Sequence, residues 1–239
     1  FESQGLLEEA VSHAFQIPDY DEVARLLSTI PIHYLFEDGG SLKIQQWVER
    51  LPRVNLLSYP YVVALMAGAS IVNGNARAAY EYLAMIETDE SVRPNTDLMR
   101  SILVRNESAD HRQALRLAQK SLSANDGADK TLANMARGQI AVNYYRLGQL
   151  EDTDEAIIEM RQAIRGSDSA SLTMHLQAIE LQGINAVAQG NLHRAERLCH
   201  EGIALATRDG QIRSPLIGVM YTGLGNVYYQ WNDLDQADA

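Results

Sequence analysis

The stretch LGNVYYQWNDLDQADA (residues 224–239) decides the fold, because its pattern recurs at a regular distance along the chain. Its apolar spacing predicts the end of one helix, a tight turn at Asn232 and the start of a second helix. Similar stretches place turns at Gly148 and Gly190, and the differences 190 − 148 and 232 − 190 both equal 42 residues. Glycine and asparagine suit these turns, since a left-handed backbone conformation costs them least.

Two weaker copies extend the repeat toward the N-terminus. IVNGNARAAYEYL (71–83) predicts a turn at Gly74, and NESADHRQALRLA (106–118) predicts one near Ala109. The spacings are 35 residues from 74 to 109 and 39 residues from 109 to 148, so the period drifts but persists. A pair of helices of this kind cannot bury its apolar stripe alone, and neighbouring pairs must therefore stack.

Small residues and helix-start signals indicate a chain of helical hairpins. Ala141, Gly183 and Gly225 lie in the first helix of successive units, where they let the second helix approach closely. Ser41 precedes the helical pattern LKIQQWVERL (42–51) and predicts a helix start there. No alternating run bounded by turn signals predicts a strand. The expected fold class is all-α, a right-handed α-solenoid of about twelve helices.

Composition narrows the function classes. With 31 acidic against 20 basic residues the formal net charge is −11, which argues against direct contact with nucleic acid, because that affinity depends on clustered Lys and Arg. Apolar runs such as YPYVVALMAGASIV (59–72) fall short of the roughly 18 residues that would suggest a membrane span. The single cysteine, Cys199, cannot form an internal disulfide, and a cytoplasmic location is expected.

No group of residues predicts catalysis or cofactor binding. None of the six histidines forms an HExxH or comparable metal motif, and no serine lies in a GxSxG turn. Cys199 occupies an apolar position of a helix and is expected to pack rather than to react. The acids of LEDTDEA (150–156) are expected near a helix start, where the helix dipole and solvent favour them. We therefore expect no enzyme, no metal site and no cofactor in these residues.

Two resemblances to known families follow from these motifs. The small-aromatic-Gly-Ala pattern of LGNVYYQWNDLDQA (224–237) resembles the tetratricopeptide repeat, although the units are longer than its usual period of about 34 residues. In the N-terminal half, residues 8–27 and 39–87 resemble the opening of the superhelical sensor domain of MalT-type regulators, which are ATP-dependent transcriptional activators of the LuxR family. The features are His13-Ala14, then WVERLP (47–52), then Leu-Leu-x-x-Pro at 56–60.

The resemblance implies a domain organisation. Residues 1–239 are expected to form one tetratricopeptide-like superhelical domain, with family-specific hairpins in 1–90 and longer repeats of about 40 residues in 91–239. The second helix of the last unit has only begun at residue 239, so we expect the chain to be a piece of a longer array. In the family, a nucleotide-binding module precedes this superhelix and a DNA-binding helix-turn-helix follows it. Neither the GxxxxGK[ST] phosphate loop nor a basic recognition helix occurs in these 239 residues.

The inner wall of the superhelix is the expected functional surface. Aromatic rings beside amides and charges on that wall suit a polar organic ligand or an extended peptide. On the repeat alignment, the residues expected to face the groove are Tyr145, Arg146, Gln177, Glu180, Asn226, Tyr229 and Gln230.

Two functions of different classes fit these features. The first is an effector-sensing domain of a MalT-like LuxR-type activator, which binds a small inducer in the superhelix and controls self-association. The alternative is a generic tetratricopeptide-like scaffold that docks a partner protein or peptide. Neither function involves a membrane or direct nucleic acid contact by these residues. We also expect weak self-association of the chain through residues 216–239, because an incomplete last repeat leaves an apolar face without its neighbour.

Overall fold

The computed structural model describes residues 7–17, 19–36, 39–125, 127–165, 172–208 and 215–238. These residues form fourteen α-helices and two 3₁₀ helices and contain no strand, which confirms the all-α fold class. The helices are α1 Leu7–Gln16, α2 Tyr20–Leu27, α3 Gly40–Val48, α4 Arg53–Ser58, α5 Pro60–Val72, α6 Ala76–Met85, α7 Arg93–Glu107, α8 His111–Ala124, α9 Lys130–Arg146, α10 Leu150–Arg165, α11 Leu172–Ala188, α12 Leu192–Arg208, α13 Pro215–Gln230 and α14 Leu234–Ala237, with the 3₁₀ helices η2 Ile32–Phe36 and η3 Glu90–Val92. None of the helices in these ranges is long and apolar enough to cross a membrane.

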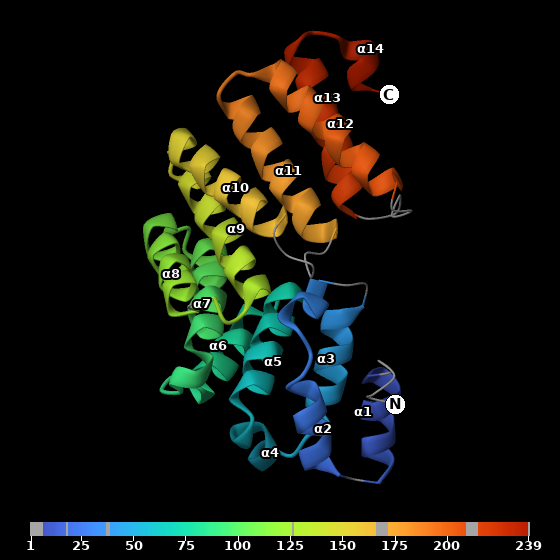
Figure 1. Ribbon diagram of the computed structural model, residues 1–239, viewed down its shortest axis with the longest axis vertical. Helices are drawn as coiled ribbons and strands as arrows, with labels where there is room; N and C mark the ends of the chain where they lie inside the picture. Colours follow the sequence, from blue (N-terminus) through green and yellow to red (C-terminus); the bar gives the residue numbers. More distant parts are fainter. Residues whose placement is uncertain are drawn as a thin grey trace.

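From α5 onward the helices pair as hairpins that follow one another along the molecule (Figure 1). The first helices of successive hairpins, α5, α7, α9, α11 and α13, pack against each other in that order. The second helices pack on their own partner and on the first helix of the next hairpin, as α8 does on α7 and α9. Neighbouring hairpins therefore bury each other's apolar faces, which confirms the α-solenoid.

All five predicted hairpin turns are confirmed by a residue with positive φ. These residues are Gly74 (74°), Ala109 (53°), Gly148 (74°), Gly190 (73°) and Asn232 (59°). In four of the turns the N–H after that residue donates to the carbonyl five positions back, as Asn191 does to Ala186 at 2.8 Å. This bond gives a partner to a carbonyl at the end of the first helix that has none within the helix. The turn at Ala109 differs, because the N–H of Asp110 is directed to Ser108 Oγ at 3.4 Å.

The small residues of the first helices lie at close contacts, as predicted. Ala141 is fully buried. A Cβ atom added to Gly225 would lie 3.4 Å from the carbonyl oxygen of Ala237 on α14, and one added to Gly183 would lie 4.0 Å from Leu198 on α12. Each of these positions thus faces the second helix of its own hairpin.

The helix predicted over 42–51, after Ser41, begins two residues earlier and ends three residues earlier. Helix α3 begins at Gly40 and ends at Val48, and Pro52 instead precedes α4. A Cβ atom on Gly40 would lie 1.9 Å from the carbonyl oxygen of Tyr34, so only glycine lets η2 pack on the helix start. The Ser41 hydroxyl does not cap the helix but donates to Asn73 Oδ1 at 2.9 Å.

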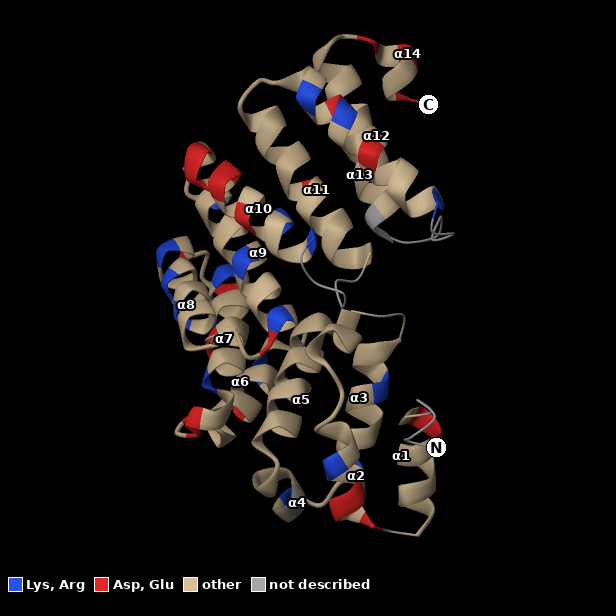
Figure 2. Ribbon diagram, in the orientation of Figure 1, with Lys and Arg blue, Asp and Glu red and all other residues tan. Residues whose placement is uncertain are grey.

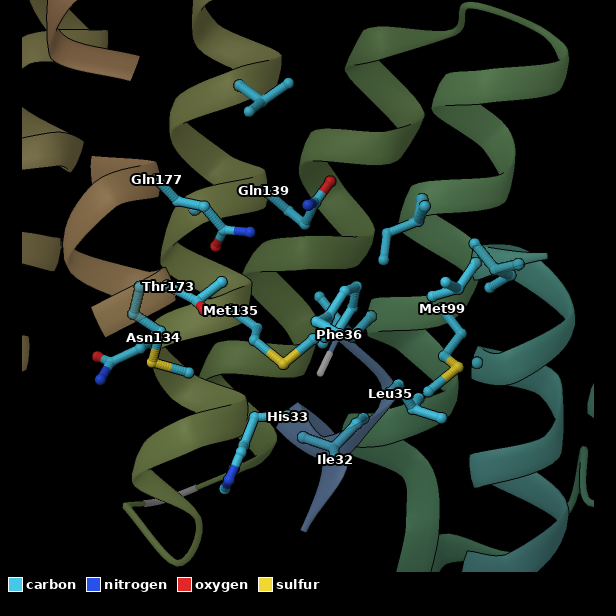
Figure 3. A pocket seen from close by; sticks show the side chains of 18 of the residues that line it. Ile32, His33, Leu35, Phe36, Met99, Asn134, Met135, Gln139, Thr173 and Gln177 are labelled. Atoms are coloured by element: carbon cyan, nitrogen blue, oxygen red, sulfur yellow. The ribbon is translucent and has the colours of Figure 1, made fainter. Parts of the chain in front are cut away.

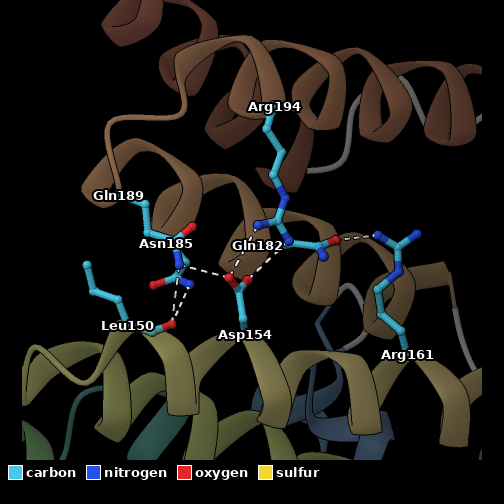
Figure 4. Close-up of polar contacts among 7 residues, drawn as sticks. All are labelled: Leu150, Asp154, Arg161, Gln182, Asn185, Gln189 and Arg194. Carbon is cyan, nitrogen blue, oxygen red and sulfur yellow. Dashed lines mark hydrogen bonds and ion pairs between the residues drawn. The ribbon is translucent and has the colours of Figure 1, made fainter.

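A polar joint fixes α10 against the following hairpin (Figure 4). The Asp154 carboxylate receives hydrogen bonds from Arg194, with Nη2 to Oδ1 at 3.1 Å and Nη1 to Oδ2 at 3.2 Å. Gln189 Nε2 adds a third at 2.8 Å. Two turns along α10, Arg161 donates to Gln182 Oε1 and to Glu201 Oε1, both at 2.6 Å.

The two ion pairs of this joint set the register of α12 on α10. Each joins residues 40 positions apart, but the acid is on α10 in Asp154–Arg194 and on α12 in Arg161–Glu201. A slip of two turns would bring Asp154 opposite Glu201, and like charges repel. Glu151 and Asp152 lie in the first turn of α10, and Asp154 lies in the next turn, so the prediction that the acids of LEDTDEA lie near a helix start is confirmed; the pairing of Asp154 with Arg194 is an additional contact.

Burial raises the pKa of Asp154, but hydrogen bonds from Gln189, Arg194 and Asn185, with the charge of Arg194, outweigh it and hold this pKa below its usual range. The side chains of Asp154 and Arg194 are only 20% and 28% exposed, so solvent screens their attraction little. The ionised form of Asp154 thus stabilises the folded state.

We expect Gly190→Ala to lower the free energy of unfolding by about 1 kcal/mol, because alanine is strained in the left-handed conformation. A Cβ atom there would meet no atom within 4 Å, so backbone strain is the whole effect. Gly218→Ala, in exposed helix with equally open space, should instead raise stability by about 0.5–1 kcal/mol. Urea unfolding measures both, and a loss of stability in the two variants alike would contradict a turn-specific origin.

We expect Asp154→Asn to lower the free energy of unfolding at pH 7 by about 1–2 kcal/mol, since charge-assisted hydrogen bonds are lost. Because the pKa of Asp154 is depressed in the folded protein, its contribution is present above the unfolded pKa of about 3.9 and disappears as the pH falls through the folded value. The difference between the native and variant chains should therefore close only in acid. Glu155→Gln, at an exposed position of α10, is the control and should show no such difference.

Candidate functional site

A cavity of about 460 Å³ opens on the inner side of the stacked hairpins. Six elements line it: η2 from the N-terminal part of the chain, the first helices α5, α7, α9 and α11, and α10 through Met160. Its volume lies in the range of cavities that hold drug-sized organic ligands. The cavity therefore joins segments that are more than 100 residues apart in the sequence.

The lining is mainly apolar and rich in methionine (Figure 3). Met99, Met135, Met160 and Met174 contribute thioethers, and the thioether of Met135 points toward Phe36 of η2. Methionine side chains are flexible and polarisable, so such a wall adapts to the shape of a ligand. Phe36 is 44% exposed although it is a large apolar residue, because it borders this cavity.

Arg105 supplies the positive charge of the cavity wall. Its Nη1 donates to Gln139 Oε1 at 2.7 Å, and its Nε and Nη2 both donate to Asn106 Oδ1 at 3.1 Å. Burial, together with the nearby charge of Arg146, lowers the pKa of Arg105 below its usual value. The guanidinium is thus held by neutral amide oxygens rather than by a carboxylate.

Glu180 supplies a negative charge farther along α11. Burial raises the pKa of its carboxyl group, and within the described ranges no side chain donates a hydrogen bond to it. Glu180 also lines a second cavity of about 120 Å³, formed with α9, α12 and α13 by residues that include Tyr145, Cys199 and Asn226. Two neighbouring cavities therefore share one half-buried acid.

The structure brings together some of the seven predicted groove residues and separates others. Gln177 and Glu180 line the larger cavity, whereas Tyr145, Glu180 and Asn226 line the smaller one. Gln230 lies beside the second group and donates to Asn226 Oδ1 at 3.2 Å.

The other two predicted groove residues lie apart from both cavities. Tyr229 is 69% exposed and borders α14 instead, and Arg146 is exposed and lines neither cavity. That any of the seven binds a ligand stays a prediction.

Sequence reasoning missed the residues that give the cavity its character. Arg105 and Met99 lie on α7, in the most degenerate repeat, where the alignment on turns gave no groove positions. The segment that became η2 has no repeat pattern, so nothing in the sequence placed Phe36 opposite Met135. The four methionines, on α7, α9, α10 and α11, were the available signal, and methionine at helical spacing more often marks ordinary core.

The candidate chemistry of the remaining residues is consistent with packing. Cys199 is buried, and burial raises the pKa of its thiol, as expected for a packing residue. No group of three or more metal-binding side chains occurs in the part of the chain that the structure describes. His193 is exposed and contacts Trp231 in a tilted arrangement, with ring centroids 4.8 Å apart and an interplanar angle of 46°.

We expect Glu180→Gln to raise the midpoint of thermal unfolding at pH 7–8 but not near pH 4. Because burial raises the pKa of Glu180 in the folded protein, ionising it costs stability, and this cost develops as the pH rises from the unfolded value toward the folded one. Glutamine removes that cost and keeps the shape. Glu159→Gln, at an exposed position of α10, is the matched control. An equal gain at all pH values would show that desolvation of the charge is not the cause.

Comparison with known proteins places this geometry in a family. The model of the MalT-like TPR region matches residues 95–239, and no curated protein matches the chain. Among solved structures, the crystal structure of BtubC (BKLC) from P. vanneervenii is similar, with 14% identity and a TM-score of 0.61 over 98% of this chain and 87% of that one, which shows the helical repeat fold alone. The matched residues hold the longer repeats, whereas the N-terminal motifs at 8–87 lie outside them. Since the family model covers more than half of the chain, this protein belongs to the MalT-like TPR family, as the resemblance predicted.

Proposed function

We propose that this domain is the effector-sensing part of a MalT-type transcriptional activator of the LuxR family, and that it binds a small organic inducer in the larger cavity. The observation that carries the proposal is the cavity of about 460 Å³, which successive first helices and η2 build together. Its apolar walls with a few convergent polar groups have the composition of small-molecule sites. Membership in the MalT-like family supports the regulatory role.

Ligand binding at this place would bear on the shape of the whole domain. The lining residues run from Ile32 on η2 to Leu181 on α11, so a bound molecule would contact four successive hairpins and the N-terminal segment at once. A change in the angle between hairpins would separate these walls. A ligand that fits one arrangement better than another shifts the population toward it. We propose that this shift controls self-association of the regulator.

Contact with DNA would fall to another part of such a regulator. The formal net charge of this chain is −11, and Figure 2 shows acidic residues gathered on the first turns of α10, while basic residues are spread over several helices. An acidic sensor would not compete with a basic helix-turn-helix for DNA phosphates. The cytoplasm is the location that this role requires.

A second function, a scaffold for a partner protein or peptide, is favoured by the exposed aromatic residues of the last hairpin. Tyr221 is 58% exposed and Tyr229 is 69% exposed, and Leu234 on α14 is 56% exposed. Concave surfaces of helical repeats hold extended peptides through side chains of this kind. On this alternative the cavity would not need to admit a small molecule.

Thermal-shift screening against sugars, amino acids, aromatic metabolites and organic acids tests the sensing function. We expect at least one compound to raise the midpoint of unfolding, because a ligand that binds only the folded state stabilises it by mass action. Gln177→Trp, which fills the larger cavity from α11, should abolish that shift. Gln162→Trp, at an exposed position of α10, should leave it unchanged.

Two results would count against the sensing function. One is that peptides raise the midpoint of unfolding and no small molecule does. The other is a small-molecule shift that survives Gln177→Trp, since binding would then lie outside the larger cavity.

A further inference from the structure

We infer that the molecule bound in the larger cavity is an amphipathic organic monocarboxylate, whose carboxylate pairs with Arg105 and whose apolar body packs on the methionine wall. This inference rests on the proposed function, because it names the chemical class of the effector. It follows from three observations: how Arg105 is bonded, what surrounds the rest of the cavity, and where Glu180 lies.

The guanidinium of Arg105 is held in place and is available to an anion. Three of the five N–H groups of its guanidinium donate to Gln139 and Asn106, which orient the plane of the group but leave its charge unneutralised. No carboxylate of the described residues lies within ion-pair distance of Arg105. Elsewhere in these hairpins a charged side chain is paired with an opposite charge, as Arg161 is with Glu201. Two N–H groups remain for a ligand oxygen.

The surroundings of Arg105 favour an anion over a neutral polar group. Arg146 adds a second positive charge nearby, which together with burial lowers the pKa of Arg105. Arg105 is half-buried, so its uncompensated charge is unfavourable, and a carboxylate would offset it with charge-assisted hydrogen bonds of matching planar geometry. A carboxylate therefore gains more from this place than an alcohol or an amide does.

The rest of the cavity requires an apolar body. Met99, Met135 and Phe36 with neighbouring aliphatic side chains form most of the wall, so a ligand with hydroxyl groups all round would leave many of them without partners. At about 460 Å³ the cavity has room for on the order of fifteen water molecules at about 30 Å³ each. A chain or ring of about ten heavy atoms beyond the carboxylate fits this space.

Glu180 limits the ligand to one carboxylate. Its carboxyl group lines the cavity on α11 and receives no hydrogen bond from the described side chains. A second anionic group at that end of the ligand would face a like charge in a poorly solvated place, which is unfavourable. A dicarboxylate of the same length is therefore excluded by Glu180, and a monocarboxylate is not.

The test is calorimetric titration of the 239-residue chain with octanoate, 3-phenylpropionate, octanamide, octylamine and octanedioate. We expect octanoate and 3-phenylpropionate to bind, and octanamide to bind about tenfold or more weakly, since it lacks the charge. Arg105→Gln should weaken octanoate by about tenfold to a hundredfold and leave octanamide unchanged. Arg105→Lys should restore part of the loss. Arg100→Gln on the same helix is the matched control, because Arg100 pairs with Glu87 and does not line the cavity.

Glu180→Gln provides an independent test of the limit to one carboxylate. It should let octanedioate bind while changing octanoate little or strengthening it. If Arg105→Gln does not fold, the comparison of octanoate with octanamide on the native chain decides the question alone.

The inference is overturned if octanamide or octylamine binds as tightly as octanoate, or if Arg105→Gln leaves the affinity for octanoate unchanged. In that case Gln177→Trp still reports on the proposed function, because it blocks ligands of any charge. Binding of neutral or cationic compounds that Gln177→Trp abolishes would keep the sensing function and reject the carboxylate. If no small molecule in the wider thermal-shift screen raised the midpoint of unfolding, both the sensing function and the carboxylate would be rejected.

Discussion

No helical hairpin of this chain can cover its own apolar surface, and the architecture follows from that constraint. Each first helix must find cover on the first helix of the next hairpin, which gives the continuous layer α5, α7, α9, α11 and α13. The same requirement draws η2 of the N-terminal segment onto α3, α5 and α9. Where the inner helices and η2 converge without filling the space between them, the cavity remains. The candidate site is thus a consequence of how the hairpins cover one another.

Charged residues serve two opposite purposes in this stack. At the joint between α10 and α12, Asp154 with Arg194 and Arg161 with Glu201 are fully paired, and their reversed order holds the register of two hairpins. At the cavity, Arg105 is bonded only to neutral amides and Glu180 to no described side chain. The chain pairs ions across hairpins elsewhere, so two unneutralised charges facing one cavity are the feature on which the proposed ligand site rests.

The position of the cavity bears on the proposed regulation. A molecule enclosed there would bridge the N-terminal segment and four hairpins, so its fit depends on their relative arrangement. The joint ties α10 to α11 and α12, the two helices of the next hairpin. In the proposed function, occupancy of the cavity would favour one arrangement of the hairpins, and that arrangement would change the tendency to associate.

The sequence by itself determined the hairpins, because each turn depends on local chemistry. Gly148, Gly190 and Asn232 take up left-handed conformations that few other residues accept. The small residues in the first helix of each hairpin mark the close contacts with the second helix. Gln177 and Glu180 could be placed on the inner wall from the same alignment. Only the tertiary structure decided that Phe36 meets Met135, that Gly40 lies under Tyr34, and that Arg105 has amides for partners. These contacts join segments far apart in the chain, and their geometry depends on the angles between stacked hairpins, which no local pattern of residues specifies.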